Sequence, residues 1–335
     1  MLRWLNPAFY TFDHVTDEMR TLLQRHKPEG FELWFWQDLD GREQSTRLSQ
    51  ADYLMVATYP LDQHILTSAT QAKLIQKTGV GVDNIDLGKA TELALPVANT
   101  PGANAPAVAE LTILLILALY RKLPVLHQSL KRGKWLMWEF RGSSYEMQGK
   151  THGLIGFGQI GQETAKRSRA FGTEIIYYDK FRAPAEIEAQ LHARYVALAE
   201  LLQTADIVSL HIPLSPQTKG LINTEILQLM KKNAVLINVS RGGVVDEQAL
   251  YHALKEGVIA GAGIDVWESE PVNADHPLLQ LDNVIATPHI GAGTVDTLKR
   301  VLATAFSNIQ MAETEQRFQY CVNGVTQLRI PKLQE

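Results

Sequence analysis

Short apolar runs rich in Val and Ile alternate with segments of helical periodicity from residue 152 onward. The runs are continuous rather than interrupted at every second residue, which is the pattern of strands buried on both faces of a sheet. Parallel strands joined by crossover helices produce this order of elements. We expect strands at HGLIGF, TEIIYYD, DIVSLHI, NAVLINV, VIAGAGIDV and NVIATPH, and helices near 159–171, 198–203, 223–230 and 246–256. This region is therefore predicted to be a doubly wound α/β domain of the Rossmann type.

The first hundred residues show a second, smaller α/β pattern, in which the apolar runs FELWFW, YLMVAT and LPVAN are separated by helical or loop segments. Helix-forming stretches near 104–120 and 294–313 adjoin the larger region, and no low-complexity linker separates the two patterns. We expect two doubly wound domains. A Rossmann domain of residues 101–290 would be inserted into a smaller, flavodoxin-like substrate domain made of residues 1–100 and 291–335.

The composition is that of a chain that buries a core, with 45% hydrophobic and 20% charged residues among 335. A formal charge of −4 and the lack of a Lys/Arg run argue against a nucleic-acid partner. The longest apolar segment, LTILLILALY at 111–120, is about half a membrane span, so it predicts a buried helix and no membrane association. A single Cys321 and a start without a signal-like apolar core favour the cytoplasm.

Three glycines follow the first predicted strand of the larger domain. Gly156, Gly158 and Gly161 form the pattern G-x-G-x-x-G, which lets a chain turn sharply, bring bare backbone to a pyrophosphate and press a helix onto the sheet. A helix from Gln159 would direct free N–H groups at that pyrophosphate. Alternatively, the glycines serve only helix–strand packing.

An acidic residue stands where the second strand ends. Asp179 lies 18 positions after Gly161, close to the spacing at which a carboxylate binds the adenosine ribose hydroxyls. A carboxylate repels a 2′-phosphate, so the expected cofactor is NAD rather than NADP. Lys180 and Arg182 follow directly and could partly reverse this preference.

Three polar residues fall at or near the ends of further strands of the same domain. Arg241 lies in INVSRGGVVDE, Glu270 in DVWESEP and His289 in TPHIGA. Ligands of open α/β sheets bind at the carboxyl ends of strands, so these residues should converge on one cleft. Taken singly, they are equally a surface cation, a turn residue and a structural histidine.

The sequence resembles the D-isomer-specific 2-hydroxyacid dehydrogenase family, which includes phosphoglycerate dehydrogenases and glyoxylate and hydroxypyruvate reductases. The matching segments are TGVGVDNID at 78–86, NTPGANAPAVAE at 99–110, the glycine pattern, LHIPLSPQTKGLIN and TPHIG. The resemblance implies NAD-dependent hydride transfer between the nicotinamide and a D-2-hydroxy acid or 2-keto acid. Because the chain ends soon after the second adjoining helix, we expect no appended C-terminal regulatory domain.

The resemblance also implies the catalytic roles. Arg241 would bind the substrate carboxylate and carbonyl oxygen with its planar fork of donors. His289 would give a proton to the carbonyl oxygen or take one from the hydroxyl. Glu270 would bind the other ring nitrogen of His289, so the two should titrate together. Relatives that oxidise formate carry an amide at this position, so the carboxylate favours hydroxy-acid chemistry.

Further site positions follow from the same resemblance. The cofactor contacts implied are Gly156, Gly158, Gln159, Ile160, Gly161, Asp179, Pro213, Thr218, Val239, Ser240, Asp265 and Gly291. Asp265 matches the carboxylate that holds the nicotinamide carboxamide, or is an ordinary strand-end residue. No metal is expected.

The substrate contacts implied are less specific. The backbone of Val80 and Gly81 would receive the substrate carboxylate. Lys77 either contacts a substrate phosphate or is an ordinary surface lysine. Asn104 either faces the active site or caps the helix ahead of Pro106. The substrate therefore stays open among glyoxylate, hydroxypyruvate, pyruvate and the phosphoglycerate class.

Two segments depart from the family pattern. His152 stands where an apolar residue normally begins the strand, and we interpret it as a substitution at an exposed strand end. The segment WLMWEFRGSSYEMQ is unusually aromatic. Because members of the resembled family pair through this region, the resemblance implies a helix stripe buried against a partner subunit in a homodimer rather than a place in the substrate pocket. An alternative function of a different class is an NAD(H)-sensing, corepressor-like binding protein of the same fold.

Overall fold

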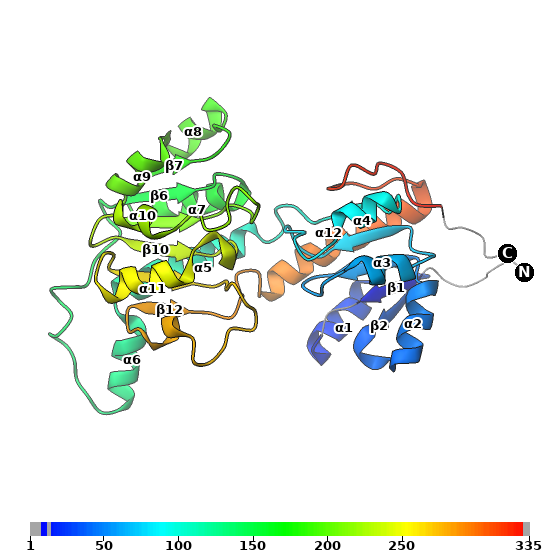
Figure 1. The fold of residues 1–335 in the computed structure, drawn as a ribbon, viewed down its shortest axis with the longest axis horizontal. Helices are drawn as coiled ribbons and strands as arrows, with labels where there is room; N and C mark the ends of the chain where they lie inside the picture. The colour runs from blue at the N-terminus through cyan, green and yellow to red at the C-terminus, as the bar shows by residue number, and fades with distance from the viewer. Residues whose placement is uncertain (1–7, 12–14, 331–335) are drawn as a thin grey trace, which may run out of the picture. The chain divides into compact units, whose positions relative to one another are not determined.

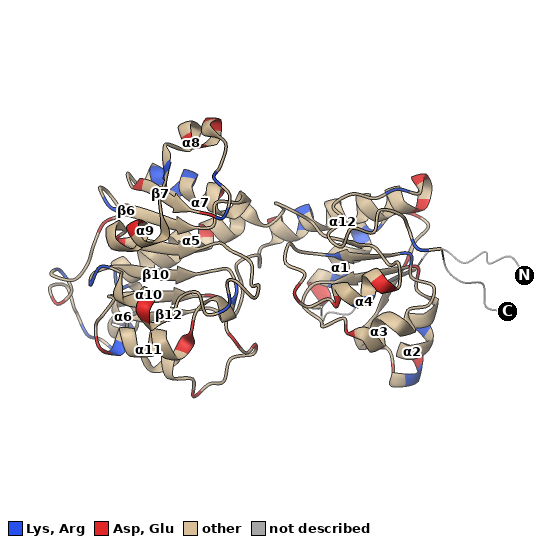
Figure 2. Ribbon diagram, turned by 45° about the horizontal axis from the view of Figure 1, so that its top comes forward, with Lys and Arg blue, Asp and Glu red and all other residues tan. Residues whose placement is uncertain are grey.

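The computed structural model describes residues 8–11 and 15–330. The chain folds into two compact units, one of residues 1–104 with 295–335 and the other of residues 105–294 (Figure 1). Charged residues of both signs are distributed over the helices and loops of each unit (Figure 2). Among the helices that the structure describes, none combines the length and the apolar character needed to cross a membrane.

The larger unit is built on seven parallel strands in the order β12-β11-β10-β9-β6-β7-β8. The strands are β6 (Thr151–Ile155), β7 (Glu174–Tyr178), β8 (Ala193–Tyr195), β9 (Ile207–Leu210), β10 (Val235–Asn238), β11 (Gly261–Ile264) and β12 (Val284–Ala286). Read from β6, this is the Rossmann order with one extra strand, and the order reverses between β6 and β9. The predicted fold and six of its strands are confirmed, whereas β8 has no counterpart in the prediction.

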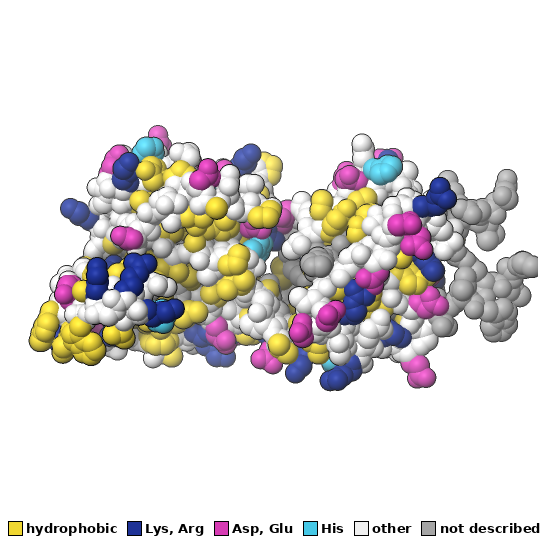
Figure 3. Space-filling view, turned by 90° about the horizontal axis from the view of Figure 1, so that it is seen from below, with side chains coloured by type: hydrophobic (Ala, Val, Ile, Leu, Met, Phe, Trp, Pro, Cys, Tyr) yellow, Lys and Arg dark blue, Asp and Glu magenta, His cyan; other side chains and the backbone are white. Residues whose placement is uncertain are grey.

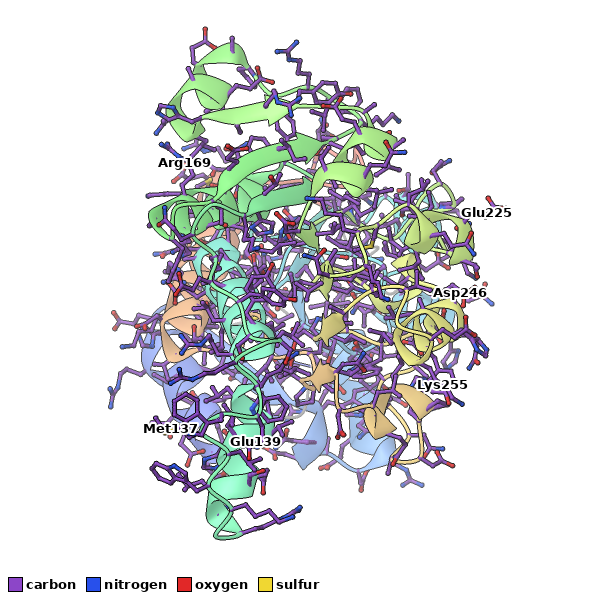
Figure 4. All side chains as sticks on the ribbon, turned by 90° about the vertical axis from the view of Figure 1, so that its left-hand side faces the viewer. Met137, Glu139, Arg169, Glu225, Asp246 and Lys255 are labelled. Atoms are coloured by element: carbon purple, nitrogen blue, oxygen red, sulfur yellow. The ribbon has the colours of Figure 1, made fainter. Side chains whose placement is uncertain are left out.

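Helices cover both faces of this sheet. One face carries α5 (Ala105–Tyr120) and α7 (Gln159–Ala170), and the other carries α9 (Leu198–Thr204), α10 (Thr224–Gln228) and α11 (Glu247–Lys255). In an end-on view, Arg169 of α7 lies on one side of the sheet, whereas Glu225, Asp246 and Lys255 lie on the other (Figure 4). Most residues of α5 are buried, as predicted for the apolar segment it contains.

The connections of this unit include three further helical segments and one projection. The short helix α8 (Ala185–Leu191) leads into the edge strand β8, and η2 (Gly242–Val244) and η3 (Pro277–Gln280) follow β10 and β11. Helix α6 (Leu123–Lys131) and the loop after it extend away from the sheet (Figure 1).

The smaller unit has five parallel strands in the order β2-β1-β3-β4-β5, which is the flavodoxin order. The strands are β1 (Ala8–Thr11), β2 (Glu32–Phe35), β3 (Tyr53–Val56), β4 (Leu74–Lys77) and β5 (Val97–Ala98). The helices are α1 (Asp17–His26), η1 (Trp36–Asp38), α2 (Gly41–Gln50), α3 (Gln63–Ser68), α4 (Leu87–Glu92) and α12 (Val295–Glu315). The predicted pair of doubly wound sheets is therefore confirmed.

Candidate active site

The glycine pattern forms a cradle between β6 and α7. Gly156 has φ 98°, and a Cβ there would lie 2.6 Å from the His211 carbonyl oxygen. A Cβ on Gly161 would overlap the Gly156 carbonyl oxygen, whereas a Cβ on Gly158 would meet no described atom within 4 Å. The first and third glycines therefore serve the turn and the packing of α7, and the second leaves open backbone. Because no described side chain caps α7, the cradle fits the pyrophosphate of a dinucleotide.

The carboxylate at the end of β7 lies beside this cradle. Asp179 accepts hydrogen bonds from the backbone N–H groups of Phe157 at 2.6 Å and Phe181 at 3.1 Å. The first of these bonds ties the carboxylate to the glycine loop. Asp179 is therefore the candidate for binding the adenosine ribose of a dinucleotide.

A histidine and a glutamate form the centre of the candidate active site. His289 Nδ1 lies 2.8 Å from Glu270 Oε2, and the Trp267 N–H donates to Glu270 Oε1 at 3.1 Å. Burial raises the pKa of Glu270, but hydrogen bonds from His289 and Trp267 and the charges of His289 and Arg241 outweigh it, so the net pKa is below its ordinary value. Glu270 is therefore a carboxylate at neutral pH that binds one ring nitrogen of His289 and leaves Nε2 for other chemistry.

Arg241 follows β10 and is held by its neighbours. Its Nη1 donates to the Ser240 carbonyl at 2.8 Å, its own carbonyl accepts from Asn238 Nδ2 at 3.0 Å, and its charge lowers the pKa of Glu270. The three candidate catalytic residues therefore lie close enough for their charges to interact, and they follow the carboxyl ends of β10, β11 and β12.

Close backbone contact holds the Arg241 segment against the Glu270 segment. A Cβ on Gly242 would overlap the backbone of Trp267 and Glu268, so only glycine fits there. Its neighbour Gly243 differs, because a Cβ would meet only Leu214 methyl groups at 3.4 and 3.5 Å.

We expect Gly242→Ala to separate these two segments. Overpacking should lower the free energy of unfolding by about 2 kcal/mol, and misplacement of Arg241 should lower kcat/KM at least about tenfold. Urea unfolding and steady-state kinetics measure the two effects. Gly243→Ala is the matched control and should change both quantities little. Wild-type stability and kinetics in the Gly242 variant would contradict the close contact.

Asp265 organises the loop that carries His289. This residue is 1% exposed, and its carboxylate accepts from Thr287 Oγ1 at 2.6 Å and from the N–H groups of Ile290 and Gly291 at 2.8 Å. The His289 N–H donates to its backbone carbonyl at 2.7 Å, and His289 adopts a left-handed φ of 54°. With three donors already on it, the carboxylate has about one of its roughly four acceptor positions left for a nicotinamide carboxamide.

Two supporting residues were absent from the sequence prediction. Trp267 supplies the N–H that binds Glu270, and its indole N–H donates to the Thr287 carbonyl at 3.2 Å. Thr287 binds Asp265 through its hydroxyl. Their places two residues from a predicted site residue, in DVWESEP and TPHIGA, were the available signal.

The other cofactor candidates of this unit lie in loops after strands or at the start of α7. Thr218 donates to the Pro213 carbonyl at 2.6 Å and accepts from the Ser215 N–H at 2.8 Å. Ser240 donates to Asn238 Oδ1 at 2.9 Å. Val239 is buried, Ile160 packs against the core under α5, and Gln159 opens α7.

The four candidate substrate contacts lie in the smaller unit. Lys77 is 6% exposed, and its ammonium donates to the Ala57 carbonyl and to Asn84 Oδ1, so its interpretation as an ordinary surface lysine is wrong. Val80 is exposed, Gly81 is half-buried, and the Val80 carbonyl accepts from Asn99 Nδ2 at 2.8 Å. Asn104 precedes α5, but its Oδ1 is buried without a hydrogen-bond partner among the described residues, so it does not act as a cap.

His152 is fully buried, so its assignment to an exposed strand end is wrong. Its Nδ1 lies 2.8 Å from Ser168 Oγ and its Nε2 2.8 Å from Ser209 Oγ. Ser209 Oγ also lies 2.8 Å from His211 Nε2. A polar chain therefore replaces the usual apolar contact inside the larger unit.

Comparison with known proteins identifies the family. Residues 113–291 match the model of the D-isomer specific 2-hydroxyacid dehydrogenase NAD binding domain. The D-3-phosphoglycerate dehydrogenase of Methanocaldococcus jannaschii is 46% identical over 76% of this chain, which spans only 48% of that protein. The glyoxylate reductase of Korarchaeum cryptofilum is 38% identical over 91% of this chain and 92% of its own length. A crystal structure of a glyoxylate reductase from Paecilomyes thermophila is 30% identical, with a TM-score of 0.82 over 95% of this chain and 98% of that one.

The matched residues contain the glycine cradle, Asp179 and the Arg241, Glu270 and His289 centre. The chain therefore belongs to the D-isomer-specific 2-hydroxyacid dehydrogenase family, a family of NAD-dependent oxidoreductases, and its larger unit carries the NAD-binding domain.

Proposed function

We propose that this protein transfers hydride between the nicotinamide of NAD and a small D-2-hydroxy acid or the corresponding 2-keto acid. The observation that carries the proposal is the 2.8 Å contact between His289 and Glu270 beside the charge of Arg241. In this proposal the larger unit binds NAD and the smaller unit, with Lys77, Val80, Gly81 and Asn104, contributes to substrate binding.

Each residue of the centre has a distinct task. Bound NAD supplies or accepts the hydride at the substrate carbon. Arg241 binds the substrate carboxylate and carbonyl oxygen, because a guanidinium offers two parallel donors. His289 Nε2 gives a proton to the carbonyl oxygen in reduction and takes the hydroxyl proton in oxidation. Glu270 holds the ring by Nδ1 and stabilises the imidazolium.

The substrate that we place first is glyoxylate or hydroxypyruvate. A glyoxylate reductase is 38% identical over 91% of this chain, and the crystal structure of another is similar over 95% of it. The Lys77 ammonium, the candidate phosphate contact, already binds Ala57 and Asn84. Pyruvate and phosphohydroxypyruvate remain members of the test panel.

We further propose a cytoplasmic homodimer. Trp135, Met137 and Trp138 are 75%, 51% and 64% exposed. They follow α6, at the end of the larger unit where hydrophobic side chains gather in Figure 3. Burial of this surface against a second copy would remove it from water. The unpaired Cys321 is in keeping with a reducing compartment.

The test of the function is consumption of NADH, with NADPH as the comparison, over glyoxylate, hydroxypyruvate, pyruvate, bulkier 2-keto acids and phosphohydroxypyruvate. We expect turnover of the small unphosphorylated acids with NADH preferred. Tight NADH binding without turnover of any of these acids would count against the enzyme and favour the cofactor-sensing alternative.

A further inference from the structure

Two cations, Lys180 and Arg182, follow Asp179 in the sequence. The Arg182 guanidinium is already bonded to a carboxylate, that of Glu188. Its Nε donates to Glu188 Oε1 at 2.9 Å and its Nη2 donates to Glu188 Oε2 at 2.8 Å. This is the two-bond geometry in which a guanidinium binds a carboxylate most strongly. The Arg182 side chain is 66% exposed and that of Glu188 only 12%, so the glutamate is the fixed partner.

Glu188 is also held by Tyr177, in the strand β7 that precedes Asp179. The Tyr177 hydroxyl donates to Glu188 Oε1 at 2.6 Å and accepts from the Ala183 N–H at 2.9 Å. Hydrogen bonds from Arg182 and Tyr177 lower the pKa of Glu188 to about 2, so it is ionised at neutral pH. The Glu188 carboxylate thus holds the Arg182 guanidinium directly. It also holds Tyr177, whose hydroxyl binds the Ala183 N–H in the same loop.

The position of Arg182 matters for cofactor choice. An arginine near the ribose carboxylate is the usual means by which this fold accommodates a 2′-phosphate. Arg182 lies three residues after Asp179, whose carboxylate is bonded to the glycine loop. We propose that Glu188 is a cofactor-selecting residue: by holding Arg182 it denies the 2′-phosphate of NADP a cationic partner and reinforces the preference for NAD. The proposal rests on the NAD site proposed at Asp179.

The test is Glu188→Gln, which keeps the size of the side chain and an acceptor for Tyr177 but removes the charge that holds Arg182. Calorimetric titration of the purified protein with NADP+ and with NAD+, without substrate, measures the two dissociation constants. We expect the Kd for NADP+ to fall about tenfold, because a freed guanidinium gains a charge-assisted bond. The Kd for NAD+ should change less than about twofold.

Two controls define the outcome. Glu200→Gln breaks the Arg194–Glu200 pair, which has the same sequence spacing in the same unit, and should leave both constants unchanged. Arg182→Leu should have little effect alone and should abolish the gain in the Glu188→Gln background. An unchanged Kd for NADP+, or equal weakening of both cofactors, would overturn the proposal. Because no turnover is measured, failure of the proposed reaction leaves this test intact.

Discussion

Replacement of His289 with alanine should lower kcat by about 10²–10⁴, the usual contribution of a positioned acid or base. Nδ1 of this ring is bound to Glu270, so Nε2 is the only ring nitrogen available for the substrate oxygen. The cofactor cradle lies on other segments, between β6 and α7 and at the end of β7. The Kd for NADH should therefore change little. Steady-state kinetics with the best substrate of the panel and NADH fluorescence titration measure the two quantities.

The control for this variant is His252→Ala, on the exposed side of α11 in the same unit, which should behave as wild type. Glu270→Gln should fall between the two, because an amide still accepts from Trp267 but cannot stabilise an imidazolium. A loss of NADH affinity as large as the loss of kcat in His289→Ala would show that His289 supports the fold of the loop instead of the chemistry. The left-handed backbone at His289 makes this distinction necessary.

Most strands were readable from the sequence as apolar runs, although β1 (Ala8–Thr11) was not predicted. The runs in β7, β9 and β10 are continuous because both faces of the sheet are covered, and their strands were predicted. Strand β4 (Leu74–Lys77) was not, because its second half is Gln76 and Lys77. Both are buried, and Gln76 donates to the Ala98 and Asn99 carbonyls and accepts from Asn308, all of which are distant in sequence. Polar residues satisfied by remote partners give no local signal.

The candidate site divides in the same way. Strand ends singled out Arg241, Glu270 and His289, and the family resemblance supplied their catalytic roles. The structure places the charges of Arg241 and His289 near enough to Glu270 to lower its pKa. What spacing does not reveal is support that depends on backbone contact, such as Gly242 against Trp267 or Asp265 beneath the His289 loop. The same limit explains why His152 was placed at the surface, since its serine partners lie 16 and 57 residues away.

Lowering the pH should reduce the unfolding free energy of the larger unit already at pH values well above those at which carboxylates titrate. His152 and His211 are the two histidines concerned. Burial lowers the pKa of each imidazole to about 3, and the charge of His211 contributes for His152, whereas in the unfolded chain each titrates near its ordinary 6.5. Below pH 6.5 the unfolded state therefore binds more protons than the folded state, so stability is complete above that pH and falls as the pH drops towards 3. At pH 5 each of these imidazoles should lower the free energy of unfolding by about 2 kcal/mol.

The variant that isolates this effect is His152→Leu, because Ser168 retains Thr173 and Ser209 retains His211 as partners. Urea unfolding followed by circular dichroism at pH 8, 7, 6 and 5 should show a fall in unfolding free energy that is about 2 kcal/mol smaller in this variant than in wild type. The exposed His252→Leu should keep the full wild-type fall.

An identical fall in wild type and His152→Leu would mean that the buried imidazole is accommodated in its charged form. The Ser168 and Ser209 hydroxyls would then have to accept from both ring nitrogens, which hydroxyl rotation permits. The pH dependence therefore separates a neutral imidazole in this polar chain from a charged one.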